Sequence, residues 1–150
     1  MDKDIPEIYN SLLDIAWHFG SQGVNGECCG DLSLVEFMAL KKTYETKECS
    51  IQEIGNALNF TKSGATRIID RLEKKGYILR KRSLLDGRVC CVTVTAQGTQ
   101  VMSKIVDQNT SYLGGVLKDF EPHRIVQIKE VLENLLCSVR QHETTLMRIL

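Results

Sequence analysis

The sequence has few of the features that mark linkers, membrane spans or secretion. It contains two prolines and no low-complexity tract, so we expect no linker between separate domains. No apolar run reaches the ~18 residues that a membrane span needs. Residues 1–6 are acidic and lack the basic-then-apolar order of a signal peptide. These absences predict one domain, residues 1–150, that stays in the cytoplasm.

Motifs of catalysis are missing as well. The sequence has no HExxH, no glycine-rich phosphate loop and no Ser/His/Asp order, and its three histidines offer little for acid–base chemistry. It has no CxxC, so neither a zinc ribbon nor a thioredoxin-type motif is supported. We therefore expect no enzyme and no required cofactor.

Six cysteines are present. Cys28 and Cys29 are adjacent, as are Cys90 and Cys91, whereas Cys49 and Cys137 stand alone. A small secreted scaffold would be richer in cysteine and poorer in core residues, so reduced thiols are expected here. Cys90 and Cys137 fit well as small apolar fillers of a core.

Charge is balanced overall but unevenly distributed. The chain of 150 residues (16.9 kDa) has 43% hydrophobic residues, which suffices for a core without disulfides. Its 19 basic and 19 acidic residues cancel, yet residues 61–88 hold nine basic and three acidic ones, a local charge of +6. Such a segment indicates contact with a phosphate backbone, or else a solvated helix face with its own ion pairs.

Polar residues mark the starts of three short helices. Ser33 and Ser50 are each followed three residues later by glutamate, which is the capping-box pattern. They predict helices that run to about residue 44 and to about residue 58. Thr61 caps a further helix over residues 62–75, and Gly76 stands where a left-handed residue ends it.

A hairpin and two long helices follow. Residues 77–82 and 89–95 are rich in β-branched and aromatic residues, and Asp86-Gly87 between them predicts a tight turn. Long helices are expected over residues 96–120 and from Pro122 onward. Residues 5–20 form an earlier amphipathic helix, and residues 20–30 a glycine-containing loop.

The last helix carries an apolar seam with alternating steps of three and four residues. Its members are Ile125, Ile128, Leu132, Leu135, Val139, His142, Leu146 and Ile149. The seam could pack on the first helix of the same chain or join two copies. We favour a homodimer, because the seam extends to Ile149 with no polar finish.

Element order indicates the fold class. Two short helices joined at residues 59–61 form a helix-turn-helix, and the hairpin that follows is a wing. The prediction is a mostly α fold with a small β-hairpin wing (α+β). A winged helix-turn-helix spans about residues 33–95, with dimerisation helices at about 5–20 and 96–150.

The helix that starts at Thr61 is the candidate for the major groove of DNA. Arg67 and Lys62 are the leading base or phosphate contacts, and Arg71 lies one turn beyond Arg67. Arg88 at the wing could enter a minor groove, with its guanidinium held by Asp86. The predicted DNA-binding residues are Ser50, Gln52, Thr61, Lys62, Ser63, Gly64, Thr66, Arg67, Arg71, Asp86 and Arg88.

Residues 50–58, 61–76 and 86–98 together resemble the MarR family of winged-helix transcription regulators. The resemblance follows the whole chain in element order. It implies a homodimer formed by the N- and C-terminal helices, a pseudo-palindromic operator in double-stranded DNA, and usually repression. Gly87 departs from the pattern, because many members carry a further arginine there.

Two kinds of input are compatible with such a regulator. One is a small effector between the dimer helices and the winged domain, near the aromatic residues of the first two helices. The other is thiol chemistry: Cys28 and Cys29 could be oxidised or bind a soft metal or metalloid. Glu27, Glu36 and His18 are possible additional ligands. A winged helix acting as a protein–protein adaptor is disfavoured by the basic segment.

Overall fold

The computed structural model describes residues 3–20 and 27–149, except for the side chains of residues 27, 28 and 145–149. It divides into two units, Met1–Asp107 and Gln108–Leu150, which are described separately. Three residues with predicted roles have side chains outside the described part. They are the possible sensor thiol Cys28 and the seam residues Leu146 and Ile149. In chain order the elements are α1 (Asp4–Gly20), β1 (Glu27–Cys29), β2 (Leu32–Ser33), α2 (Leu34–Thr46), β3 (Cys49–Ser50), α3 (Ile51–Ala57), α4 (Lys62–Lys74), β4 (Ile78–Arg82), β5 (Cys90–Val94), α5 (Ala96–Leu117) and α6 (Pro122–Ile149).

The three predicted helix caps are confirmed. The Ser33 hydroxyl accepts from the Glu36 backbone N–H, and the Ser33 N–H donates to the Glu36 carboxylate. Ser50 and Glu53 form the same reciprocal pair at α3. Those hydrogen bonds lower the pKa of the Glu53 carboxyl. Each cap satisfies backbone N–H groups that a helix start otherwise leaves unpaired, and so defines where the helix begins.

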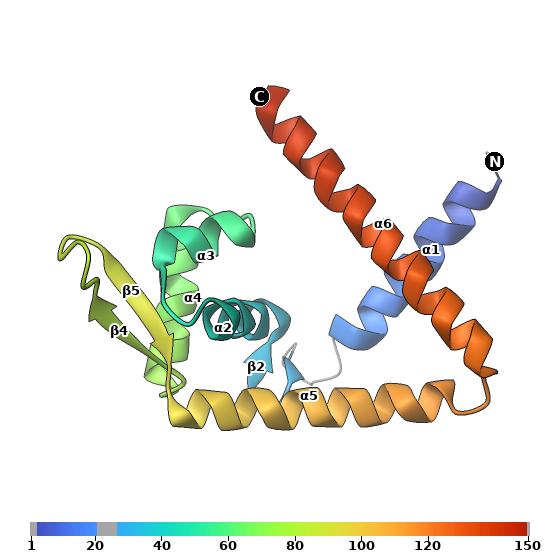
Figure 1. Ribbon diagram of the computed structural model, residues 1–150, viewed down its shortest axis with the longest axis horizontal. Helices are drawn as coiled ribbons and strands as arrows, with labels where there is room; N and C mark the ends of the chain where they lie inside the picture. Colours follow the sequence, from blue (N-terminus) through green and yellow to red (C-terminus); the bar gives the residue numbers. More distant parts are fainter. Residues whose placement is uncertain (1–2, 21–26, 150) are drawn as a thin grey trace. The chain divides into compact units, whose positions relative to one another are not determined.

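The wing is part of a three-stranded antiparallel sheet in the order β3-β5-β4. In Figure 1 the β4–β5 hairpin extends away from the helices α2, α3 and α4. The predicted hairpin is confirmed, with Arg82 paired to Cys90 nearest the turn. The sequence did not indicate β3, which has only two residues. Residues 27–29 were predicted as loop, but they form β1, which pairs with β2.

The core of the first unit lies between α2, α3, α4 and the sheet. Its fully buried members include Leu40, Ile54, Ile69, Ile78 and Val92. Met102 and Ile105, from the first part of α5, belong to the same cluster. The apolar side of α4 is thereby buried, which leaves its opposite side available to solvent.

Two glycines allow the close approach of the α4 end to the α5 start. Gly76 has a φ of +79°, as its predicted position after the helix requires. A Cβ on Gly98 would lie 2.1 Å from the carbonyl oxygen of Tyr77. Thr95 secures this contact, because its hydroxyl donates to the Gly76 carbonyl and accepts from the Gly98 N–H. Only glycine fits at position 98 without displacing backbone.

Apolar side chains of α1 and α6 are exposed within the described chain. On α1, Ile5 and Trp17 are prominent, and no residue of this helix is buried. On α6, Leu132 is 51% and Val139 is 45% exposed, which leaves the predicted seam uncovered in this single chain. Among the described helices, none combines the length and apolar character that crossing a lipid bilayer requires.

Replacing Gly98 with alanine should lower the free energy of unfolding by about 2 kcal/mol, because the new Cβ collides with the Tyr77 carbonyl. Urea denaturation followed by circular dichroism measures this change. Gly114→Ala on the same helix is the control: nothing lies within 4 Å of its Cβ, so it should be neutral or mildly stabilising. Equal stability of the Gly98→Ala protein and the wild type would contradict the close approach.

Candidate nucleic-acid interface

The first turn of α4 presents an exposed polar surface. Lys62, Ser63 and Arg67 are exposed, and together with Thr61 and Thr66 they line one shallow hollow. The opposite side of the same helix buries Ala65, Ile68, Ile69 and Leu72. The core therefore determines which side of α4 faces outward, and that side carries the residues predicted to read DNA.

A cleft of about 590 Å³ joins this turn to α3 and to the turn end of the wing. It is lined by Ser50 at the N-cap of α3 and Gln52 within α3, by Lys62 and Thr66 from α4, and by Arg88 near β5, among others. The structure thus brings together predicted residues from three separate segments of the chain. Arg71 does not line this cleft, but it is exposed on α4 one turn beyond Arg67.

Several hydroxyl groups that were predicted to contact DNA form hydrogen bonds with the backbone of their own helices. Thr61 accepts from the Gly64 N–H at 3.1 Å, and Thr66 donates to the Lys62 carbonyl at 2.9 Å. Ser50 is engaged in the α3 capping box. These groups hold the helix starts in place, whereas the long side chains of Lys62 and Arg67 extend beyond them. The hydroxyls of this surface are therefore engaged within the chain, whereas its cations Lys62 and Arg67 are exposed.

Two of the three acidic residues in the basic segment form ion pairs with one arginine. Arg80 on β4 pairs with both Asp70 and Glu73 of α4. Burial would lower the pKa of the Arg80 guanidinium, but hydrogen bonds and charge from these two carboxylates raise it. Lys75 is likewise paired, with Glu36. The other seven of the nine cations form no ion pair with any described residue: Lys62, Arg67, Arg71, Lys74, Lys81, Arg82 and Arg88.

At the wing turn, Asp86 acts differently from the prediction. Its carboxylate accepts from the backbone N–H of Arg88 at 3.0 Å, and no ion pair joins it to the Arg88 guanidinium among the described contacts. A carboxylate two residues before an N–H closes a local turn, which competes with the predicted pairing. The Arg88 side chain is therefore available to an external anion.

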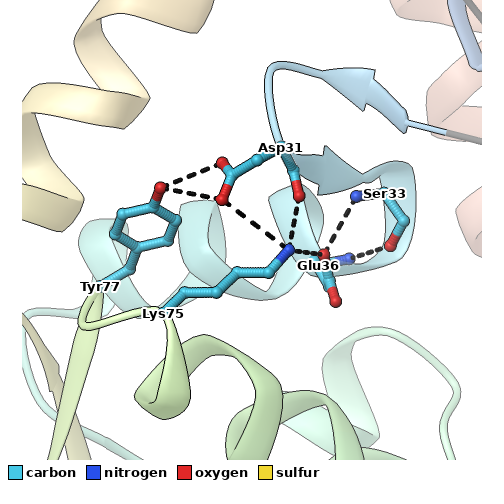
Figure 2. A network of polar contacts seen from close by, with 5 residues as sticks. All are labelled: Asp31, Ser33, Glu36, Lys75 and Tyr77. Atoms are coloured by element: carbon cyan, nitrogen blue, oxygen red, sulfur yellow. Dashed lines mark hydrogen bonds and ion pairs between the residues drawn. The ribbon is translucent and has the colours of Figure 1, made fainter. Parts of the chain in front are cut away.

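Figure 2 shows a polar network at the other end of α4. The Lys75 ammonium donates to the Glu36 carboxylate at 2.9 Å and to the backbone carbonyl of Asp31. The Tyr77 hydroxyl donates to the Asp31 carboxylate at 3.0 Å. Burial and the neighbouring Asp31 raise the pKa of Tyr77. The network ties the β1–β2 turn and the start of α2 to the end of α4.

The sequence did not identify this role for Lys75, which is one of nine cations in the basic segment. Glu36 is only 5% exposed, so its charge needs a partner. Lys75 is separated from it by 39 residues, and only the packing of α2 against α4 brings the two together. The capping-box pattern predicted the contact of Glu36 with Ser33, three residues away. It did not predict the contact with Lys75.

The thiols differ from the predictions in two ways. Cys29 is disulfide-bonded, not reduced, and lies buried in β1. Cys90 and Cys137 are exposed and free, not core fillers; the buried free thiols are those of Cys49 and Cys91. Burial raises the pKa of both Cys49 and Cys91, which keeps these thiols protonated and unreactive at neutral pH.

Metal binding receives little support in the described region. Glu36, a possible extra ligand, is engaged by Ser33 and Lys75. The side chains of Glu27 and Cys28 lie outside the described residues. Within the part that is described, no three metal-ligating side chains come together.

The sequence of this region is similar to that of known proteins. Residues 32–90 match the model of the MarR family. The regulator PapX of Escherichia coli is 32% identical over 107 residues, which cover 71% of this chain and 60% of PapX. The regulator MhqR of Bacillus subtilis is 23% identical over 110 residues, covering 73% of this chain and 76% of MhqR.

Solved structures show the same fold. A MarR family protein from Bacillus stearothermophilus superposes with a TM-score of 0.81 at 21% identity, covering 93% of this chain and 98% of that one. FabT of Streptococcus pneumoniae, solved in complex with DNA, gives a TM-score of 0.68 at 21% identity, covering 93% and 95%. The predicted winged helix-turn-helix is thereby confirmed.

Replacing Lys75 with methionine should lower the free energy of unfolding by about 1–2 kcal/mol, because the buried Glu36 carboxylate loses its charged partner. The loss stays this small because Lys75 is partly exposed, so solvent screens its attraction to Glu36. Thermal or urea denaturation provides the measurement. The adjacent Lys74→Met variant is the matched control: this exposed lysine has no described partner, and its loss should change stability by less than about 0.5 kcal/mol. Equal effects of the two substitutions would refute the network.

Proposed function

This chain belongs to the MarR family of winged-helix transcriptional regulators, and we propose that it acts as a repressor that binds a pseudo-palindromic operator as a homodimer. The observation that carries the proposal is the set of unpaired cations on the outward side of α4 and on the wing. Its relatives are transcriptional regulators and not enzymes, which agrees with the lack of catalytic motifs in the sequence.

The distribution of charge supports a duplex as the partner. Lys62 and Arg67 lie at the start of α4, the part of such a helix that reaches base edges in the major groove. Arg88 lines the same cleft as Lys62, and in this proposal it would meet the neighbouring backbone or minor groove. A protein adaptor would have no use for cations at both positions.

Exposed apolar side chains support the homodimer. The α6 seam includes Leu132 and Val139, and α1 adds Ile5 and Trp17, all of them exposed in the single chain. Apolar stripes of this length on two helices are stabilised when a second copy covers them. A twofold axis would then present two α4 helices to successive turns of one duplex.

A small effector is the proposed input. The expected pocket lies near aromatic residues of α1 and α2. Among these, Trp17 and Tyr44 are exposed, so a ligand or a second copy could cover them. The disulfide at Cys29 favours thiol chemistry as a second candidate. Measuring operator affinity with and without reductant, in wild type and Cys29→Ser, separates the two inputs.

Arg67→Ala should weaken operator binding by about 1–3 kcal/mol and relax the preference for one operator over others. The loss of a cation that contacts DNA should also reduce the slope of log K against log salt. Fluorescence anisotropy with a duplex that the wild type selects from a random library measures both effects. Arg124→Ala, which removes one exposed arginine from α6, should leave affinity and slope unchanged. Unaltered binding of Arg67→Ala across several selected duplexes would remove this residue from the interface.

Leu132→Glu should convert the dimer to monomers, because a carboxylate would be buried unpaired in the seam. Sedimentation equilibrium should give twice the chain mass of 16.9 kDa for the wild type and a single chain mass for the variant. Gln127→Glu adds the same charge outside the seam and should remain dimeric. A monomeric wild type would exclude the twofold arrangement.

A further inference from the structure

Two adjacent leucines at the tip of the wing are almost completely exposed. Leu84 is 97% and Leu85 is 100% exposed, and the next most exposed large apolar side chain among the described residues is Trp17, at 69%. Singly exposed leucines are ordinary on protein surfaces. A neighbouring pair with no contact to the rest of the chain is not explained by folding, because neither side chain contributes to a core.

The backbone of this tip is held in one conformation. The Ser83 hydroxyl accepts from the N–H groups of Leu85 and Asp86, at 3.2 and 3.4 Å. Below the turn, the Val89 N–H donates to the Asp86 carbonyl, and the Ser83 N–H donates to the Val89 carbonyl. These bonds hold the backbone of the Leu84–Leu85 segment at the end of the hairpin, so the two apolar side chains project from a hydrogen-bonded turn.

Cations surround this projection. Lys81 and Arg82 precede it and Arg88 follows it, and none of the three has an ion pair with a described residue. Arg88 also lines the cleft that contains Lys62 and Thr66. An apolar protein surface would leave these cations unpaired on contact. A polyanion with an apolar interior, namely duplex DNA with its stacked bases, matches both the cations and the leucines.

We propose that Leu84 and Leu85 form a wedge that enters the minor groove of the operator and partly unstacks one base step in each half-site. Apolar side chains inserted between base pairs kink a duplex, and the cationic flanks hold the phosphates on either side. The wedge thereby adds specificity without hydrogen bonds to bases, since flexible steps such as TA and CA unstack at the lowest cost. This inference rests on the DNA binding proposed above and extends it to the wing.

The test uses the full-length protein and a duplex that the wild type selects from a random library. 2-Aminopurine, whose fluorescence increases when it unstacks, is substituted for adenine at successive positions of the duplex. Wild type should produce a fluorescence increase at one step in each half-site. Leu84→Ser combined with Leu85→Ser should abolish the increase and weaken binding by roughly tenfold, without changing the salt slope, because no charge is lost.

Leu79→Ser is the matched control. Leu79 is a half-exposed leucine of the same hairpin, paired with Thr93 at the end distant from the turn. This variant should keep both affinity and the fluorescence increase. Thermal denaturation of all variants verifies that the hairpin remains folded, which is expected for the tip because its leucines pack against nothing.

The possible outcomes distinguish the wedge from DNA binding itself. If wild type binds tightly but no position becomes unstacked, or if the double variant retains the fluorescence increase, the wedge is wrong while the regulator still binds DNA. If wild type selects no duplex at all, the proposed function fails and the wedge with it. Loss of the increase in the double variant alone, with an unchanged salt slope, supports the wedge.

Discussion

The buried carboxylate of Glu36 is the constraint on which the position of α4 depends. A charge with 5% exposure requires hydrogen bonds and a counter-charge. The Ser33 N–H supplies a hydrogen bond from the N-cap of α2, and Lys75 supplies the counter-charge from the end of α4. Asp31 adds contacts to Lys75 and Tyr77 (Figure 2). The end of α4 is thus anchored to α2 and to the β1–β2 turn, and its start is left to face outward.

The function of the surface follows from how its charges are divided. Arg80 holds Asp70 and Glu73 and so joins the wing to α4, which removes two of the three acidic residues from competition with the remaining cations. Lys62 and Arg88 line one cleft, and Arg67 lines the neighbouring hollow with Lys62, so the unpaired cations lie close together. The ion pairs of Arg80 therefore hold the wing against α4, and in doing so they help to position the cations that remain unpaired.

Local patterns made much of this fold predictable. The caps at Ser33, Ser50 and Thr61 and the Asp86 turn all depend on residues within a few positions of each other, and each was found where expected. Strand β3 escaped prediction because two residues carry no periodicity and acquire strand geometry only by pairing with β5. Exposure of Cys90 was mispredicted because strand alternation alone does not reveal which face a neighbouring element covers.

By itself the sequence determined the type of each long element, the winged-helix order and the segment that carries the cations, because these depend on spacing and on residue chemistry along the chain. The tertiary structure alone decided which cations are free. Lys74 and Lys75 are neighbours with identical chemistry, yet Lys75 is bound to a carboxylate 39 residues away. Such pairings arise when distant segments are packed into one core, and no local pattern records them.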